Sequence, residues 1–573
     1  MSRYPSPIQY RLELIETAAG TGYFNALPQE IATVGDGLAY LRRHPNDSFM
    51  HAHLLVRIGE MDQGAIFDLL AREGGSTPAV QALVLEAATV YPHLSAVRDA
   101  FCDHPIQILA DQTPLVILRS ELLADQKTHR QWAQLFHDNL FQHRRLPPPA
   151  STGLPFPFDG IDGSDDPLPA QAHLTAIIKR YLPEMAGFGK PRQSLEATIA
   201  KAISRLNRLE IFDGPEMRHQ SSLSRYALLR KWRFNHVIKV GQLNYTLSSV
   251  QTAYGRGRSL EAARASCLME VAERCSAFTS VAETRILGTR RPHPVRHGCH
   301  SQLTADGYPL LNPNSLALEV PYRDEPLYWI EGEQLTADGT RSIWVPVQCV
   351  FLFSNLDERS LFSGLGSTGL ASGNTMAEAR LSALYEVIER DCAAVNPYHP
   401  SRCFRIHAQD PQLSALFNDY LTRGIHLQFQ DISPAFGIPC CTCFVTHHDG
   451  TVAKGGGANL NGRLAVLSAL TETPYPYPAG PPSTPATPAL PWLEFESLPN
   501  FSTGIPERDL MLLEKTLAGN GFTPIYVDIT RKDLEIPVVK ALIPGLEMTA
   551  DFDRYCRISP RLFNNYLKIY KKN

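Results

Sequence analysis

Apolar residues recur at helical spacing through the first part of the chain. Segments such as GAIFDLLAREG and AVQALVLEAATVY carry apolar residues at every third or fourth position. Consecutive segments of this kind are typical of stacked helical hairpins, although no strict repeat of a named solenoid is present. The pattern therefore predicts an all-α helical-hairpin domain over residues 1–145.

This periodicity ends in a stretch that is dense in Pro, Gly and Asp, at residues 146–170. Such a composition is typical of a linker or a long surface connection. Few contacts usually cross a segment of this kind. We therefore expect a chain that begins near Leu168 to fold without the helical domain.

From residue 171 onward, helical segments alternate with short apolar runs. Residues 194–212 indicate a helix that leads into a strand. Further strands are expected at residues 235–243, 342–353, 425–433, 439–447 and 524–530. This alternation predicts a mixed α/β (α+β) domain over residues 171–573. A second proline-rich break, at residues 473–492, predicts an extended loop inside that domain.

Composition narrows the class of protein. The chain has 573 residues, of which 44% are hydrophobic and 20% charged, with a net charge of -4. These values are ordinary for a globular protein and give no basic face for nucleic acid or membrane. No apolar run reaches the roughly 18 residues of a membrane helix. The polar N-terminus and eleven cysteines without a disulfide framework predict a cytoplasmic protein.

A twelve-residue motif occurs twice in the predicted α/β domain. Residues 263–274 (ARASCLMEVAER) and 379–390 (ARLSALYEVIER) are identical at eight of twelve positions, and each copy follows a glycine-bearing loop. A single Glu-x-x-Glu-Arg is usually a solvated helix face, with Glu and Arg paired one turn apart. Two copies, each with a serine one turn earlier, favour a function for this face.

The repeated face is acidic. On a helix, one stripe holds Glu378, Ser382, Glu386 and Glu389. Glu270 and Glu273 of the first copy have the same spacing as Glu386 and Glu389. Carboxylate oxygens suit Mg²⁺, whose remaining coordination positions usually go to water and phosphate. Glycine loops at helix N-termini favour anions such as phosphate. The chain has no P-loop motif. The two stripes therefore predict a shared Mg²⁺ and phosphate site of another kind.

Three cysteines in the segment IPCCTCFV, Cys440, Cys441 and Cys443, are a second candidate for chemistry. Zinc sites usually need two cysteine pairs, or a cysteine pair and a histidine pair, at set spacing. The spacing here favours small apolar residues of a buried strand instead.

The doubled motif, together with GFGKPRQSLEATIAKAISRL at residues 187–206, resembles the YcaO family. Members of that family bind ATP without a P-loop and activate backbone amides. The resemblance covers roughly residues 171–573 and implies ATP and Mg²⁺ as cofactors. It implies that the metal is held by Glu270, Glu273, Glu386 and Glu389. It further implies contacts to the nucleotide from Lys190, Ser266, Asn374, Glu378 and Arg390. It assigns no catalytic residue.

The resemblance implies ATP-dependent activation of a peptide amide by phosphorylation of the carbonyl-derived oxygen. With external sulfide the product is a thioamide, and with an internal Cys or Ser side chain it is an azoline. A nucleotide-binding accessory protein, which assists another enzyme in modifying a ribosomal protein or peptide, is the alternative. Expected partners are a peptide or protein substrate, a sulfur donor or accessory protein, and a second copy in a homodimer.

Two departures from the family pattern bear on this choice. Many members carry an arginine in the helix that contains Ser468, and the nearest substitute, Arg463, lies more than a turn away. Azoline-forming members commonly end in a proline-rich motif, whereas this chain ends in YLKIYKKN. Azoline formation is therefore less favoured than another use of the same phosphorylation chemistry.

Overall fold

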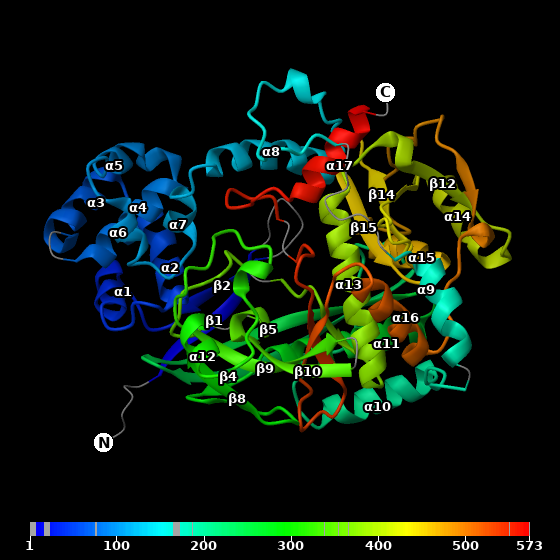
Figure 1. Ribbon diagram of the computed structural model, residues 1–573, viewed down its shortest axis with the longest axis horizontal. Helices are drawn as coiled ribbons and strands as arrows, with labels where there is room; N and C mark the ends of the chain where they lie inside the picture. Colours follow the sequence, from blue (N-terminus) through cyan, green and yellow to red (C-terminus); the bar gives the residue numbers. More distant parts are fainter. Residues whose placement is uncertain are drawn as a thin grey trace.

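The computed structural model describes residues 7–15, 23–74, 77–163, 172–185, 187–336, 339–352, 355–364, 366–548 and 551–571. Within these residues, strands form a large sheet of 13 strands and a small sheet of five. The fold is thus the mixed α/β class that the sequence predicts, and Figure 1 shows its helices arranged around the two sheets.

The large sheet has the strand order β11-β18-β17-β9-β8-β7-β6-β4-β5-β1-β2, with β10 paired to β9 and β3 to β4. Its strands are β1 (Ile8–Ile15), β2 (Tyr23–Pro28), β3 (Met217–Arg218), β4 (Tyr226–Val240), β5 (Leu243–Gly257), β6 (Val281–Ala282), β7 (Arg285–Ile286), β8 (His293–Gly298), β9 (Leu327–Thr336), β10 (Gly339–Pro346), β11 (Leu370–Ser372), β17 (Ile525–Asp528) and β18 (Val538–Leu542). The long strands β4 and β5 form an antiparallel hairpin whose two-residue turn needs Gly241, at a φ of 53°.

The small sheet has the order β15-β14-β13-β12-β16. Its strands are β12 (Cys403–His407), β13 (Gln428–Asp431), β14 (Cys440–Thr446), β15 (Val452–Ala458) and β16 (Trp492–Glu494). Cys440, Cys441 and Cys443 are buried in β14, as the sequence predicts. The predicted strand at 342–353 ends at Pro346, because proline cannot donate to the ladder.

Helices cover and connect the sheets. They are α1 (Val34–Leu41), α2 (Ser48–Gly59), α3 (Gln63–Leu69), α4 (Pro78–Val90), α5 (Ser95–Asp99), α6 (Ile106–Ala110), α7 (Ile117–Glu121), α8 (Gln126–Gln142), α9 (Leu174–Tyr181), α10 (Leu195–Asn207), α11 (Leu260–Ala277), α12 (His300–Ala305), α13 (Met376–Val395), α14 (Pro411–Thr422), α15 (Gly462–Glu472), α16 (Pro506–Ala518) and α17 (Pro560–Lys571). Helix α11 packs on β4 and β5, whereas α13 contacts β11 and β18 of the large sheet and β15 of the small one. Helix α13 therefore joins the two sheets.

The prediction of an all-helical segment over residues 1–145 is wrong at its start. Strands β1 and β2 form there, and β1 pairs in parallel with β5 from Ile8 opposite Tyr245 to Arg11 opposite Ser248. The side chains of Ile8, Tyr10 and Leu12 are buried. Apolar residues at alternate positions are typical of a strand with one buried face. The helical pattern belongs to the residues that follow this segment.

Helices α1–α8 form where the sequence predicts helices, and α1–α7 share one apolar core with the large sheet. Leu54 of α2 and Leu83 of α4 belong to the same buried cluster as Trp329 and Val345. This shared core opposes the expectation that a chain beginning near Leu168 folds alone. The domain boundaries at residues 145 and 171 stay a prediction.

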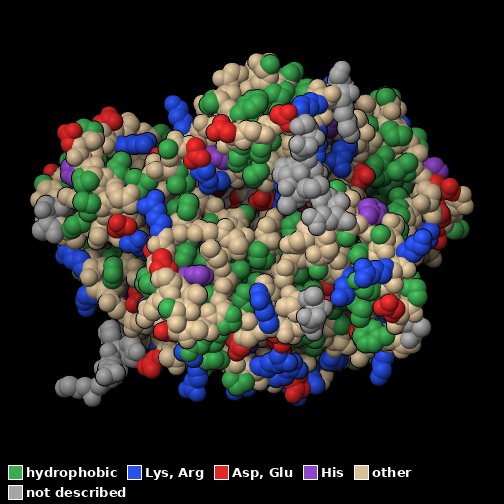
Figure 2. All heavy atoms as spheres, in the orientation of Figure 1, with side chains coloured by type: hydrophobic (Ala, Val, Ile, Leu, Met, Phe, Trp, Pro, Cys, Tyr) green, Lys and Arg blue, Asp and Glu red, His purple; other side chains and the backbone are tan. Residues whose placement is uncertain are grey.

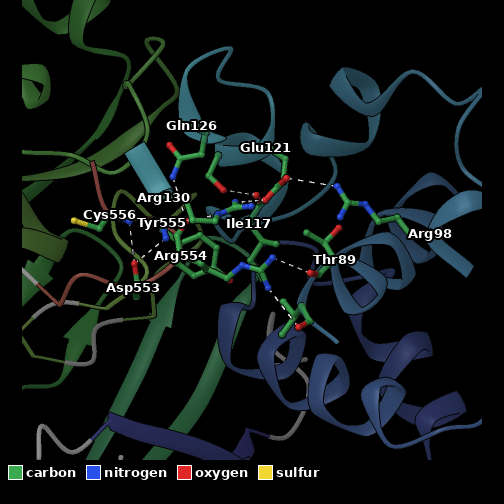
Figure 3. A network of polar contacts seen from close by, with 12 residues as sticks. Thr89, Arg98, Ile117, Glu121, Gln126, Arg130, Asp553, Arg554, Tyr555 and Cys556 are labelled. Atoms are coloured by element: carbon green, nitrogen blue, oxygen red, sulfur yellow. Dashed lines mark hydrogen bonds and ion pairs between the residues drawn. The ribbon is translucent and has the colours of Figure 1, made fainter. Parts of the chain in front are cut away.

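The helical unit is also bonded to a segment near the C-terminus (Figure 3). Arg554 donates to the carbonyl of Thr89 at 2.8 Å. Its own carbonyl accepts from Gln126 Nε2 at 3.1 Å and from Arg130 Nε at 3.2 Å. Helices α8 and α17 lie side by side over a common cluster of aromatic residues. The first and last parts of the chain thus stabilise each other.

The predicted linker at residues 146–170 is held against this contact. The carbonyl of Pro155 accepts from Trp132 Nε1 at 2.8 Å, and that of Pro147 from the Tyr566 hydroxyl at 2.7 Å. Residues 164–170 lie outside the described part of the chain. The proline-rich stretch at 473–492 is irregular up to β16, as predicted, although its Tyr475 and Tyr477 are buried.

No helix in the described ranges is long and apolar enough to cross a membrane. On the face shown in Figure 2, acidic and basic side chains are interspersed. This surface agrees with the small net charge of -4.

Candidate functional site

The two copies of the repeated motif form helices α11 and α13, and each helix begins directly after a strand. Ser259 caps α11 by accepting from the backbone N–H of Ala262 at 3.1 Å. Thr375 caps α13 by accepting from the backbone N–H of Glu378 at 3.2 Å. Both predicted helices are confirmed, and their caps are residue types that favour this position.

Glycines let the helices pack directly on the strands. A Cβ at Gly255 of β5 would lie 2.1 Å from the carbonyl oxygen of Ala263 in α11. A Cβ at Gly457 of β15 would lie 2.1 Å from the carbonyl oxygen of Ala465 in α15. Gly456 points to the other face of β15, where a Cβ would lie 2.6 Å from Glu389 Oε1. This close packing brings α11, α13 and α15 toward one region.

The first copy of the motif holds its glutamates with its own strand and arginine. Glu270 accepts from the backbone N–H of Tyr254 at 2.8 Å. Arg274 Nη2 lies 3.4 Å from Glu270 Oε1 and 3.6 Å from Glu273 Oε1. Both glutamates are thus partly neutralised within α11.

In the second copy of the motif, the arginine lies farther from its glutamate. Arg390 Nη2 lies 4.0 Å from Glu386 Oε1, and the Arg390 side chain is 54% exposed. Glu389 lies over Gly456. The two copies act on each other electrostatically: the charge of Glu386 raises the pKa of Glu273, and the charge of Arg274 in α11 lowers the pKa of Glu386. The convergence of all four glutamates on one cleft stays a prediction.

Burial raises the pKa of all four glutamates: Glu270, Glu273, Glu386 and Glu389. For Glu389 the pKa rises to about 7, with Arg390 opposing the shift. Carboxylates that lose water without enough opposite charge resist ionisation. The cluster is thus short of positive charge, which favours a cation or a cationic group beside it.

Sequence reasoning missed a fifth glutamate at this cluster. Glu472, at the end of α15, raises the pKa of Glu270, Glu386 and Glu389. It forms an ion pair with Arg256 of β5. One signal could have found it, since the glycine run 455–457 precedes α15 much as glycine loops precede the two motif helices.

A buried lysine on β18 was also missed. The Lys540 side chain is fully buried and donates to the carbonyl of Thr368 at 2.8 Å. Burial lowers its pKa to about 8, while Glu386 and Glu273 oppose the shift. No local pattern in the sequence indicates that this lysine faces α11 and α13.

The start of α13 forms a second polar group. The Asn374 side chain donates to Thr198 of α10 at 2.9 Å, and its backbone N–H donates to Glu378 Oε2 at 3.1 Å. Lys201 donates to the carbonyl of Asn374 at 3.3 Å, and Arg192 lies 3.8 Å from the buried Glu378. Asn374 and Glu378 are therefore brought together at one end of the α13 stripe.

The remaining predicted residues lie on the surface. The Ser266 and Lys190 side chains are exposed. The backbone N–H of Lys190 donates to Glu507 at 3.3 Å, which places the lysine beside α16. Its segment approaches the α13 stripe through Arg192. No contact joins Lys190 itself to the four predicted metal ligands among the described residues.

Arg463 does not replace an arginine at position 468. Its Nη2 donates to the carbonyl of Glu496 at 2.6 Å, away from the cluster. Ser468 lies one helical turn before Glu472, on the same face of α15.

The donor set fits a hard divalent cation. Its ligating atoms are carboxylate oxygens, the type that Mg²⁺ prefers. In the described part of the chain, no group of three or more His, Cys, Asp or Glu side chains is arranged closely enough to hold a metal ion. The glutamates face arginines of their own helices instead. The chemistry of the site fits Mg²⁺, whereas coordination needs these side chains to draw together.

Comparison with known proteins gives a family match over this region. The model of the YcaO cyclodehydratase family, described as ATP- and Mg²⁺-binding, matches residues 254–475 and 474–547. An uncharacterized protein of Methanothermobacter thermautotrophicus is 28% identical over 330 residues, covering 51% of this chain and 81% of the relative. An uncharacterized protein in the tfuA 3′ region of Rhizobium leguminosarum bv. trifolii is 28% identical over 246 residues, covering 40% of this chain and 54% of the relative.

Two solved structures are similar at low identity. A heterocyclase in complex with substrate and cofactor has a TM-score of 0.48 and 18% identity, covering 63% of this chain and 54% of that one. YcaO from Methanopyrus kandleri, bound with AMPPCP and Mg²⁺, has a TM-score of 0.44 and 20% identity, covering 62% of this chain and 91% of that one. The match thus spans about half of the heterocyclase chain.

Proposed function

This chain belongs to the YcaO family, whose model matches half of its length, and on that premise we propose that it uses ATP and Mg²⁺ to activate a backbone amide of a peptide or protein. The family is described as ATP- and Mg²⁺-binding. The substrate and the product of this member are part of the proposal.

One observation supports the proposal: glutamates of three helices act on one another electrostatically, and burial raises their pKa. Glu270 and Glu273 come from α11, Glu386 and Glu389 from α13, and Glu472 from α15. The first four would hold Mg²⁺, and Glu472 adds a fifth oxygen donor to the same region. Held by these carboxylates, Mg²⁺ would supply positive charge that offsets the charge of the triphosphate.

The nucleotide contacts are proposed around this cluster. Arg390 has an exposed side chain beside the second copy and would face phosphate. Asn374 and Glu378 would contact the nucleotide at the start of α13. Lys190 and Ser266 have exposed side chains that are open to a ligand. A guanidinium and an ammonium group are suited to phosphate oxygens.

The proposed reaction needs positioning more than covalent work by the protein. A nucleophile adds to the amide carbon, and the carbonyl-derived oxygen takes the terminal phosphoryl group of ATP. That oxygen then leaves as part of phosphate, with ADP as the second product. With sulfide the amide becomes a thioamide, and with a neighbouring Cys or Ser side chain it closes to an azoline. The residues of the cluster hold and orient the reactants.

The description of the family as cyclodehydratases favours azoline formation as a second candidate. An accessory role, in which the chain assists another enzyme, is the third outcome to be tested. All three share the nucleotide site and differ in the product and in the need for a partner.

Mass spectrometry separates these outcomes. Proteins and peptides are compared between cells with and without this chain, and a candidate substrate is then treated with the purified chain, ATP and Mg²⁺, with and without sulfide. A gain of about 16 Da, oxygen replaced by sulfur, supports thioamide formation, whereas a loss of about 18 Da supports an azoline, both with ADP formed as phosphoryl transfer requires. A change that needs a second protein supports the accessory role. A purified chain that binds no ATP in the presence of Mg²⁺ contradicts the proposal.

A further inference from the structure

Arg256 occupies a fixed position at the edge of the acidic cluster. It lies near the end of β5, between two glycines that touch α11. A Cβ at Gly255 would lie 2.1 Å from the Ala263 carbonyl oxygen, and one at Gly257 would lie 2.6 Å from the Ala262 Cβ. The backbone around Arg256 is therefore pressed against α11, and its side chain extends to α15 instead.

The guanidinium of Arg256 is only partly used by the protein. It forms an ion pair with Glu472, and its side chain is 21% exposed. Its Nε is buried and has no hydrogen-bond partner among the described residues. Guanidinium has five N–H donors and no acceptor, and a buried donor without a partner is costly. The geometry thus leaves donor capacity facing the region between β5 and α15.

Among the described residues of α15, the one arginine, Arg463, does not pair with Glu472. Ser468 lies one turn before Glu472 on the same face of α15 and has a short side chain. Arg463 is bonded to the carbonyl of Glu496 at 2.6 Å. Arg256 is therefore the arginine of β5 that forms an ion pair with Glu472.

We propose that Arg256 binds a phosphate group of the nucleotide from β5, beside the face of α15 that carries the short Ser468 side chain. This inference rests on the proposed function, because it concerns the same nucleotide. A guanidinium presents parallel N–H donors that match two phosphate oxygens. The ion pair with Glu472 then orients the guanidinium of Arg256. The Nε, which has no partner among the described residues, can donate to phosphate when the side chain turns toward it.

A purely structural role for Arg256 makes a different prediction. If Arg256 only bridges β5 and α15, its replacement lowers the stability of the fold and leaves the nucleotide affinity of the folded protein unchanged. A matched control is available in Arg264 of α11. It forms a two-pronged ion pair with Glu216, at 2.9 Å from Nε and 2.8 Å from Nη2, and touches no glutamate of the cluster.

The test is calorimetric titration of the full chain with a non-hydrolysable ATP analogue and Mg²⁺. We expect Arg256→Gln to weaken binding at least about tenfold, as the loss of a charged hydrogen bond implies. Arg264→Gln should bind within twofold of the parent. Adding Ser468→Arg to Arg256→Gln should restore at least about threefold, because it returns a guanidinium to this face of α15.

Arg256→Lys keeps the folded protein available if the glutamine variant does not fold. Lysine retains the charge but loses the fork, so its binding should fall severalfold. Affinity within twofold of the parent in every folded Arg256 variant overturns the inference. So does an equal loss in Arg264→Gln. A parent that binds no nucleotide contradicts the proposed function itself, whereas a parent that binds while Arg256→Gln binds equally well contradicts this inference alone.

Discussion

Helices α11 and α13 carry nearly the same motif, yet their glutamates have different surroundings. In α11, Glu270 has a backbone donor from β5 at 2.8 Å, and the Arg274 side chain is only 25% exposed. In α13, the Arg390 side chain is 54% exposed and lies 4.0 Å from Glu386. The first copy is fixed by its own strand, whereas the second keeps its arginine free to reach outward. Two nearly identical motifs can therefore differ in their roles.

The neighbouring glycines differ in the same way. Gly255 leaves room for the backbone of α11, whereas Gly456 leaves room for the end of the Glu389 side chain. Main-chain packing therefore restricts substitution beside the first copy, whereas the position of the Glu389 carboxylate restricts substitution beside the second copy.

The largest effect is expected from Glu389→Gln. The change keeps the shape but removes a carboxylate proposed to hold Mg²⁺, so Mg²⁺-dependent ATP turnover should fall on the order of 100-fold. The fold should persist, because a buried carboxyl with a raised pKa is lost. ADP release and thermal unfolding measure the two effects. Glu261→Gln, an exposed change in the first turn of α11, serves as the control.

Unchanged turnover in Glu389→Gln would remove this residue from the site. A large drop in melting temperature would instead assign it to the fold.

Gly255→Ala should act on stability. Its Cβ would meet backbone atoms of α11 at 2.1 and 2.3 Å, which cannot move without shifting the helix. We expect the free energy of unfolding to fall by about 3 kcal/mol, as overpacking implies. Gly456→Ala should cost less stability but reduce turnover, because its Cβ displaces the flexible end of Glu389. Denaturant unfolding and ADP assays of both variants compare the copies, and equal stability losses would contradict the contrast.

Lys190→Ala tests whether Lys190 contacts the phosphates of the nucleotide beside the second copy of the motif. The Lys190 segment approaches α13 through Arg192, which lies 3.8 Å from Glu378. Loss of a charged hydrogen bond should weaken binding of an ATP analogue by about 1.5–3 kcal/mol, while Mg²⁺ dependence remains. Titration calorimetry measures this loss. Affinity within twofold of the parent would return Lys190 to the solvated surface.

The smallest expected effect concerns pH. Burial raises the pKa of Glu389 to about 7, above the ordinary value of 4.5. The folded state therefore keeps a proton that the unfolded state loses, and this contribution to stability is present at low pH and lost as pH rises through about 7. Without Mg²⁺, the free energy of unfolding of the parent should fall over this range more steeply than that of Glu389→Gln. Parallel pH profiles would contradict the assignment.

The sequence predicts the parts of this site that depend on local pattern. The period of 3.6 residues and the repeated motif predict both helices, whereas the convergence of the two acidic stripes stays a prediction. The buried cysteines of β14 also follow from alternation within one strand. The pairing of Arg256 with Glu472 and the effect of Lys540 on Glu386 do not follow from local pattern, because separate elements far apart in the sequence carry these residues.

The main error in predicting the fold lies at the N-terminus. Residues 8–13 alternate apolar and polar side chains, which indicates a strand, but the helical segments that follow dominated the assignment. Composition alone predicts a linker at residues 146–170. Tertiary contacts, such as that of Trp132 with Pro155, hold part of it against α8. Composition cannot indicate which surface a loop will contact.

The central claim is that the two acidic helices bind one Mg²⁺–nucleotide unit together. A double-mutant cycle tests it most directly, with Glu273→Gln in α11 and Glu386→Gln in α13, and calorimetric titration of a non-hydrolysable ATP analogue with and without Mg²⁺. If both carboxylates serve one site, each change weakens Mg²⁺-dependent binding and the two losses are coupled by about 1 kcal/mol or more. Losses that add within about 0.5 kcal/mol, or binding that does not depend on Mg²⁺, would contradict the claim.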